Sequence, residues 1–192
     1  MDRLISDEQW RQLTQWITLQ MGLHFPQDRL PDLKRRLLSA AGEFSFGSIE
    51  PFVSWLLSTK LTRRQVEMLA SYLTIGETYF FREMISLEAL EKYILPELIA
   101  SRRRMKYLRI WSAGCATGEE PYTLAILLQR LIPDIEKWRI TLLATDINAR
   151  FLERAAQGIY REWSFRGSFQ WLKDQYFTRT MDGSYRISDK IR

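Results

Sequence analysis

Apolar residues recur at helical spacing throughout the N-terminal part of the chain. Ser6 and Gln9 have the spacing of a capping box before Trp10, Leu13 and Ile17, and Gly22 is placed to end that helix. Three further helices are expected. The first has an apolar stripe and ends at Gly42 (Leu30, Leu33, Leu37 and Ala41), and the second lies around Trp55 and Leu56. The third is capped by Thr62 with Gln65 and carries Val66, Leu69 and Leu73. Because no strand pattern appears before residue 105, residues 1–75 are predicted to form a separate all-α domain.

The pattern changes from helical to α/β in the second half of the chain. A connector helix from Met84 to Ser101, which Pro96 should kink or split, precedes two short apolar runs at Leu108–Ala113 and Ile140–Thr145. A helix from Glu120 to Leu131 separates these runs, and this order predicts a βαβ unit of a parallel sheet. Further along, Asn148 is expected to cap a helix that Gly158 ends, a short helix should run from Ser168 to Tyr176, and residues 177–187 read as a hairpin that turns at Asp182-Gly183.

Two parallel strands are few for a domain of this kind. An open α/β domain usually needs about five or six strands. We therefore expect the natural protein to continue beyond Arg192, so that this chain is a fragment. An unfinished sheet would expose an apolar edge and face, and we expect non-native self-association through it.

The amino-acid composition limits which kinds of catalytic or metal site the chain can form. The chain has 192 residues, 46% hydrophobic content and a net charge of +5, with one cysteine and one histidine. These counts exclude an internal disulfide framework and a zinc cluster of thiolates, and they leave little for a metal site or a histidine-based triad. No signal-peptide core or membrane-length apolar run is present in the sequence, so a cytoplasmic location without membrane insertion is expected.

The loop after the first predicted strand has the features of a nucleotide-type pocket. Its small residues let a ligand approach the backbone closely (Ala113, Gly114, Ala116 and Gly118), and Thr117 with Glu120 has the spacing of a capping box. Glu119 and Glu120 lie where a helix that binds pyrophosphate keeps acids away. Two carboxylates favour a ligand with ammonium, sulfonium or sugar hydroxyl groups, which indicates S-adenosylmethionine rather than NAD or ATP. The alternative is that both acids complement the helix dipole.

Asp146 follows the second predicted strand. An acid at the carboxyl end of such a strand can hydrogen-bond ribose hydroxyls, and it would face the same crevice as the loop around Gly114. The alternative, a helix cap, suits Asn148 better.

The segment Leu73–Glu83 is a third candidate site. If it is helical, Thr78 and Arg82 share a face and could point at one ligand while Phe80 and Phe81 pack elsewhere. The alternative is an aromatic hinge with Arg82 in a surface ion pair.

Together, Leu73–Glu83, Ile110–Tyr122 and Thr145–Asn148 resemble the CheR family of chemotaxis-receptor methyltransferases. The resemblance covers essentially the whole chain. It implies an all-α domain (1–75), a connector with a cofactor-contacting segment (76–106) and the first part of a Rossmann-like class I methyltransferase domain with the start of a small antiparallel subdomain (107–192). The family methylates receptor glutamates with S-adenosylmethionine, which leaves S-adenosylhomocysteine, and uses no metal.

The resemblance also implies site residues. Cofactor contacts are expected from Thr78, Arg82, Glu119 and Asp146, beside the loop at Gly114. The family's usual asparagine two residues before Thr78 is Gly76 here, whose backbone could substitute. Because the family's later cofactor motifs are absent from this chain, the chain alone is expected to bind the cofactor weakly or not at all and to be inactive. No catalytic residue is assigned, since a carboxylate nucleophile needs no general base.

Substrate recognition is predicted for a basic cluster in the helical domain. Lys34, Arg35 and Arg36 could meet the acidic, cytoplasmic methylation helices of a receptor, and a solvated helix face is the alternative. Two rival functions are a nucleic-acid methyltransferase, which would need a larger basic groove, and a non-catalytic receptor-binding module on a methyltransferase scaffold. We expect no nucleic-acid partner.

Overall fold

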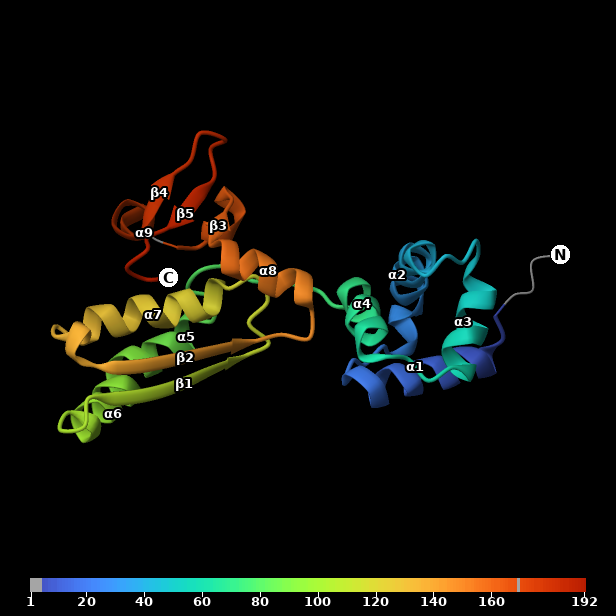
Figure 1. The fold of residues 1–192 in the computed structure, drawn as a ribbon, viewed down its shortest axis with the longest axis horizontal. Coiled ribbons are helices and arrows are strands. Elements are labelled where there is room, and N and C mark those ends of the chain that lie inside the picture. The colour runs from blue at the N-terminus through green and yellow to red at the C-terminus, as the bar shows by residue number, and fades with distance from the viewer. Residues whose placement is uncertain (1–4, 169) are drawn as a thin grey trace. The chain divides into compact units, whose positions relative to one another are not determined.

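The computed structural model describes residues 5–168 and 170–192. The chain divides into two compact units: residues 1–75 with 147–149, and residues 76–146 with 150–192. Figure 1 labels the elements of both units. Each unit has its own buried hydrophobic cluster. The predicted fold class is confirmed, since an all-α unit precedes an α/β unit that carries a small antiparallel sheet.

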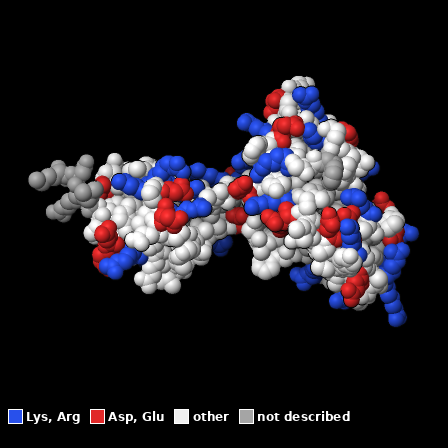
Figure 2. Space-filling view, turned by 180° about the vertical axis from the view of Figure 1, so that it is seen from behind, with Lys and Arg blue, Asp and Glu red and all other residues white. Residues whose placement is uncertain are grey.

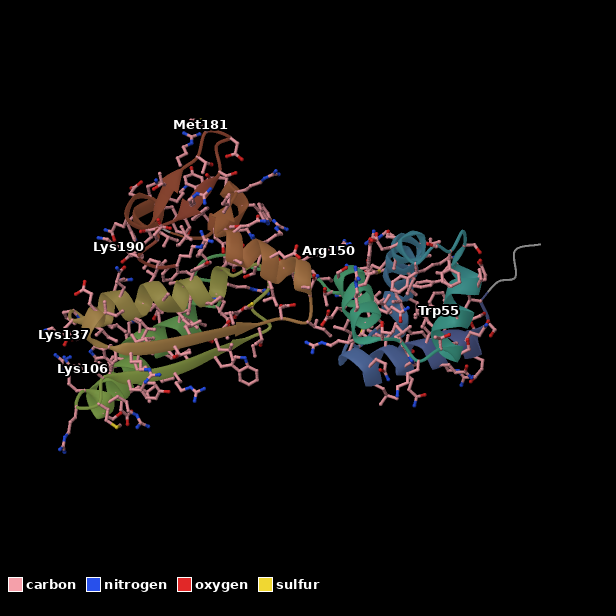
Figure 3. All side chains as sticks on the ribbon, in the orientation of Figure 1. Trp55, Lys106, Lys137, Arg150, Met181 and Lys190 are labelled. Carbon is pink, nitrogen blue, oxygen red and sulfur yellow. The ribbon has the colours of Figure 1, made fainter. Side chains whose placement is uncertain are left out.

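The first unit is a helical bundle. Its elements are α1 (Asp7–Met21), the 3-10 turn η1 (Gln27–Arg29), α2 (Leu30–Glu43), α3 (Ile49–Ser58) and α4 (Arg63–Leu73). The predicted stripes form its core, in which Leu13, Ile17, Leu33, Leu37, Phe52 and Leu69 are completely buried. Phe44 and Trp55, which is labelled in Figure 3, pack their rings 5.6 Å apart at the edge of this core.

The helix caps of this unit follow local sequence signals. Ser6 and Gln9 form the expected capping box on α1, and Gly22 ends that helix with a left-handed φ of 69°. Thr62 with Gln65 caps α4 in the same way. The expected end of α2 at Gly42 is wrong: the helix continues to Glu43, and Ser45 is the residue that turns left-handed, with φ 63°.

The connector of the second unit is one helical run with a widened turn. It consists of α5 (Met84–Ala89), the π-helical turn η2 (Leu90–Ile94) and α6 (Leu95–Arg102). Pro96 has no N–H to give to the carbonyl four residues earlier, and its ring would crowd that carbonyl. The N–H of Leu95 instead bonds Leu90 O, five residues back, so the predicted irregularity takes the form of a π-turn just before Pro96.

The main sheet has two parallel strands, β1 (Tyr107–Ala113) and β2 (Arg139–Thr145). Tyr107 pairs with Arg139 and Ala113 with Thr145, so both strands end at the same edge. The connection between them contains α7 (Glu119–Leu131) and the 3-10 turn η3 (Ile135–Lys137), and α8 (Ala149–Gln157) follows β2. Lys106 and Lys137, labelled in Figure 3, mark the opposite edge, where the strands begin.

Only one face of this sheet is well covered. Leu108 and Ser112 are buried on the face that α6 and α7 contact. On the other face the side chains of Trp111 and Leu143 are 67% and 54% exposed. The alternation of buried and exposed positions along β1 therefore matches a strand with one solvent-facing side.

The small sheet has the antiparallel order β3-β5-β4. Its strands are β3 (Ile159–Tyr160), β4 (Phe177–Arg179) and β5 (Tyr185–Ile187), and the 3-10 turn η4 (Glu162–Phe165) and α9 (Gln170–Tyr176) lie between β3 and β4. The predicted hairpin is confirmed, and it closes with Gly183 at φ 80°. Strand β3, which pairs with β5, was not predicted. In the described part of the chain, no helix is both long and apolar enough to cross a membrane.

Candidate cofactor site

The loop between β1 and α7 is hydrogen-bonded to residues at the carboxyl end of β2. The N–H groups of Gly114 and Cys115 donate to Thr145 O at 2.8 and 2.9 Å. The N–H of Ala116 donates to the Asp146 carboxylate at 2.8 Å. Asp146 and the loop around Gly114 therefore meet at one edge of the sheet, as the sequence predicts, and one oxygen of Asp146 positions the loop.

Two glycines of this loop have different roles. Gly118 has φ 96°, and a Cβ there would lie 2.8 Å from both Ala155 Cβ and the Tyr160 hydroxyl, so glycine is needed for packing. Gly114 has φ 76°, and a Cβ there would meet nothing within 4 Å. The backbone at Gly114 therefore faces open space, which is what close approach of a ligand requires.

The predicted capping box on α7 is wrong. The helix begins at Glu119 with Gly118 as its N-cap, so the N3 position is Pro121, which carries no carboxylate. The Thr117 hydroxyl donates instead to Glu119 Oε2 at 2.6 Å. Glu120 Oε1 accepts a hydrogen bond from the Ser112 hydroxyl, also at 2.6 Å.

The two acids at this helix start have separate environments. Glu119 is 2% exposed, and its other oxygen accepts a hydrogen bond from the Ser164 hydroxyl at 2.9 Å. Glu120 is exposed to solvent. Glu119 therefore joins segments of the protein, while Glu120 presents its carboxylate to solvent.

The segment from Thr74 to Glu83 is not helical, so the prediction that Thr78 and Arg82 share a helix face is wrong. Phe81 and Glu83 both adopt a left-handed φ of 58°, which a continuing helix does not allow. The Arg82 guanidinium donates to the carbonyl of Glu77 and closes the segment into a loop. As predicted, Phe80 and Phe81 pack in the core, with 0% and 6% exposure.

Backbone hydrogen bonds hold this loop against α7 and η4. The N–H of Phe81 donates to the Thr123 hydroxyl at 3.2 Å, and the N–H of Phe80 donates to Ser164 O at 2.8 Å. The unusual φ of Phe81 is thus fixed by contacts from elsewhere in the unit, a pattern often found at functional sites. Sequence reasoning identified neither Thr123 nor Ser164, because both act on residues distant in the chain.

Gly76, where the family usually has asparagine, lies under an aromatic ring. A Cβ at this position would come within 2.5 Å of Phe151 Cζ and 2.7 Å of Cε2. The ring of Phe151 therefore occupies the space that a side chain at residue 76 would need. Any contact from Gly76 to a ligand must come from its backbone.

Cys115, within this loop, and Tyr160, which bonds the loop, are both buried. Burial raises the pKa of the Cys115 thiol, and the nearby Asp146 carboxylate raises it further. Burial also raises the pKa of Tyr160, whose hydroxyl donates to Thr117 O at 2.9 Å. A thiol held in its neutral form is a poor nucleophile, which agrees with a packing role for Cys115.

A pocket of about 310 Å³ lies between α7 and α8 over β2. It is lined by Gly118, Pro121, Tyr122, Ala125, Leu142, Ala144, Leu152, Ala155, Ala156, Ile191 and Arg192. None of the six residues predicted to bind the cofactor lines it. Within the described residues, no group of three or more His, Cys, Asp or Glu side chains could hold a metal ion.

The basic cluster of the first unit separates into two kinds of residue. Arg36 bonds Asp32 at 2.8 Å and donates to the carbonyls of Tyr72 and Thr74 at the end of α4, so it joins two helices. Arg35 is 77% exposed while it pairs with the other oxygen of Asp32, and Lys34 is also exposed. Lys34 and Arg35 therefore present their charge to solvent.

Comparison with known proteins decides the family. The model of the CheR methyltransferase SAM-binding domain matches residues 76–192. The chain belongs to the CheR methyltransferase family. The match includes every cofactor residue expected from the resemblance, from Gly76 to Asp146, and the small antiparallel sheet.

Relatives resemble the chain along nearly its whole length. It is 30% identical over 189 residues to chemotaxis protein methyltransferase 2 of Vibrio cholerae, covering 98% of this chain and 65% of the relative. It is 27% identical over 191 residues to the chemotaxis protein methyltransferase of Borreliella burgdorferi, covering 98% and 67%. The Listeria monocytogenes protein of that name is 30% identical over 179 residues, covering 93% and 65%. The chain thus spans about two thirds of the length of these relatives.

Proposed function

We propose that the protein transfers the methyl group of S-adenosylmethionine to glutamate carboxylates of chemotaxis receptors. The observation that carries this proposal is the family match over residues 76–192, which contains the acidic helix start at Glu119 and Glu120 and the strand-end acid Asp146. The names of the relatives support the link to chemotaxis. The proposed substrates are cytoplasmic parts of receptors, which implies a cytoplasmic location.

Methyl transfer to a carboxylate requires the protein to position the two reactants and does not require proton transfer. S-adenosylmethionine supplies a methyl group activated by its sulfonium. The C–S bond breaks as the C–O bond to the glutamate oxygen forms, and the electron pair of the broken bond stays on sulfur, leaving S-adenosylhomocysteine and a neutral ester. The carboxylate is already the nucleophile at neutral pH, so in-line orientation and exclusion of water supply most of the catalysis.

We assign the cofactor to the edge of the main sheet where β1 and β2 end. The open backbone at Gly114 and the exposed carboxylate of Glu120 suit a ligand with an ammonium or sulfonium group. Asp146 Oδ2 already accepts the N–H of Ala116, and we assign ribose binding to its carboxylate. Thr78, Arg82, Gly76 and Glu119 remain proposed contacts, Gly76 through its backbone, and Glu119 supports the site by holding Thr117 and Ser164 in place.

We propose that acidic methylation helices of the receptor contact Lys34 and Arg35. Both side chains are exposed on α2, whereas Arg36 is engaged with the end of α4. Replacing Lys34 and Arg35 together by Glu should raise the KM for receptor at least several-fold and leave the affinity for S-adenosylmethionine unchanged. An unchanged KM would show that this helix face is merely solvated.

The direct test uses the natural gene product with methyl-labelled S-adenosylmethionine and purified receptor cytoplasmic domains. We expect base-labile label on receptor glutamates, and we expect Asp146→Asn to lower kcat/KM at least tenfold while the matched surface variant Asp174→Asn does not. The 192-residue chain is assayed beside it, and we propose that it is inactive alone. Receptor that remains unlabelled under these conditions would contradict the proposal.

The same assay separates the two rival functions. A nucleic-acid methyltransferase would label RNA or DNA, and a non-catalytic receptor-binding module would label neither substrate while still binding receptor. On the face shown in Figure 2, Lys and Arg side chains are interspersed with Asp and Glu side chains over both units. This distribution favours a protein substrate over a phosphate backbone.

A further inference from the structure

Ser164, in the 3-10 turn η4 that leads from the small sheet, connects the two parts of the proposed cofactor site. Its carbonyl accepts the N–H of Phe80 at 2.8 Å, two residues beyond Thr78. Its hydroxyl donates to the Glu119 carboxylate at 2.9 Å, at the start of α7. Ser164 in η4 therefore bonds both the Thr78–Arg82 loop and the start of α7.

Arg166, two residues after Ser164, also contacts the Thr78–Arg82 loop. Its Nη1 donates to the carbonyl of Thr78 at 3.3 Å and to that of Trp163 at 2.9 Å. Its guanidinium carbon lies 4.3 Å from the ring centre of Tyr79 and 4.4 Å from that of Trp163. Nη2, which is buried and has no hydrogen-bond partner in the described part of the chain, lies 3.6 Å from the Glu77 carboxylate.

These contacts act on the backbone of the residue expected to touch the cofactor. The Thr78 carbonyl is held by Arg166, the preceding carbonyl of Glu77 by Arg82, and the N–H of Phe80 by Ser164. Because backbone groups on both sides of Thr78 are fixed, two of them from the η4 region and one from within the loop, the direction of the Thr78 side chain depends on these contacts. The same turn also orients Glu119, so both halves of the site share one support.

We propose that Ser164 and Arg166 are positioning residues for cofactor binding, which link the small antiparallel sheet to the Thr78 loop. This inference rests on the proposed function. Arg166 suits the task because a planar guanidinium stacks between two aromatic rings while its edge donates to carbonyl oxygens, and a lysine ammonium cannot do both. We assign neither residue a contact with the reacting atoms, because their observed contacts are to Glu119 and to the backbone of the Thr78 loop.

The test compares Arg166→Gln, Arg166→Lys and Ser164→Ala in the natural gene product, with the exposed Arg161→Gln as the matched control on the same segment. Calorimetric titration with S-adenosylmethionine should show at least a tenfold rise in Kd for Arg166→Gln, little recovery in Arg166→Lys, and a rise of a few-fold for Ser164→Ala. Arg161→Gln should bind like the wild type. At saturating cofactor, kcat should recover most of its value, because the loss lies in the ground-state binding.

A double-mutant cycle with Thr78→Ala distinguishes positioning from loss of stability. If Arg166 acts by holding Thr78, Arg166→Gln should add little to the Kd of Thr78→Ala. Additive effects, or a Kd in folded Arg166→Gln equal to the wild-type value, would overturn the inference while leaving the proposed function intact. A wild-type protein that binds no S-adenosylmethionine would instead contradict the proposed function, and the inference with it.

Amide hydrogen exchange gives a readout that needs no cofactor. The amides of Phe80 and Phe81 should exchange at least tenfold faster in Ser164→Ala and Arg166→Gln, and amides of β1 should keep their wild-type rates. Should Arg166→Gln not fold, Arg166→Lys and Ser164→Ala provide the same comparison. Unchanged exchange at both phenylalanines would contradict the proposed support of the loop.

Discussion

At the residue scale, the buried and the open acids at the start of α7 show how context assigns roles. Glu119 and Glu120 are neighbours in the chain, yet one is 2% exposed and bonded to two hydroxyls while the other is exposed to solvent. The difference depends on Ser164, which lies 45 residues away from Glu119 in sequence. A reading of the sequence recognises that two acids replace a phosphate site, but it cannot tell which one is buried.

Gly76 offers a prediction about packing. Gly76→Ala should lower the free energy of unfolding by about 1–3 kcal/mol, because the new Cβ would press on the ring of Phe151. In a Phe151→Leu background the same change should cost much less, since the ring that it meets is gone. Urea unfolding of the wild type, the two single variants and the double variant measures this coupling.

Gly42→Ala is the matched control for that prediction. Gly42 lies inside α2, where a Cβ would meet nothing within 4 Å, so alanine should stabilise the protein by about 0.5–1 kcal/mol. If Gly76→Ala were as stable as the wild type, the steric explanation for glycine at this position would be wrong.

The Asp32 carboxylate gives a pH prediction. Its hydrogen bond to Arg36 is the main cause of a pKa below its ordinary value of 3.8. Because the pKa of Asp32 is lower in the folded state, its ionised carboxylate stabilises the fold at pH values above 3.8. This stabilisation is lost as the pH falls through the folded-state pKa. Asp32→Asn should therefore destabilise the bundle at pH 6, and the difference from the wild type should shrink at pH 3.

Urea midpoints at the two pH values, followed on amide signals of α2 and α4, measure the effect. In an Arg36→Gln background the pH-dependent part of the Asp32→Asn effect should be much smaller. A difference between Asp32→Asn and the wild type that stays constant from pH 6 to pH 3 would contradict the ion-pair explanation.

At the element scale, sequence predicted the features that depend on nearby residues. The capping boxes at Ser6 and Thr62, the two parallel strands and the irregular turn before Pro96 follow from spacing and from the chemistry of single residues. These signals act within a few positions along the chain, so a pattern of side chains is enough to identify them.

The elements that sequence missed are fixed by distant contacts. The Thr78–Arg82 segment has helical spacing, but the left-handed Phe81 is held by Thr123, which lies 42 positions away. Strand β3 has two residues and exists because it pairs with β5. The capping box expected at Thr117 fails because the left-handed Gly118 becomes the N-cap. In the first two cases tertiary contacts outweigh a local pattern, and in the third the backbone conformation of a glycine does.

At the scale of the whole molecule, the open face of the main sheet leads to a prediction about association. Trp111 and Leu143 are large, apolar and mostly exposed on that face, and exposed apolar surface on a short sheet promotes contact between copies. The 192-residue chain should therefore self-associate as its concentration rises. Sedimentation velocity should show less association for Leu143→Lys, whereas Leu19→Lys, at a site of α1 that is 75% exposed, should behave like the wild type.

Equal association of Leu143→Lys and the wild type would show that the open sheet face is not the contact surface. A wild-type chain that stays monomeric at every concentration would contradict the self-association proposal itself.

The β1–α7 loop, Asp146 and the Thr78 loop provide the proposed site for methyl transfer. The most direct measurement is transfer of labelled methyl groups from S-adenosylmethionine to receptor cytoplasmic domains by the natural gene product. We expect base-labile esters on receptor glutamates, reduced at least tenfold by Asp146→Asn. Label on nucleic acid instead, or receptor that stays unlabelled, would contradict this expectation.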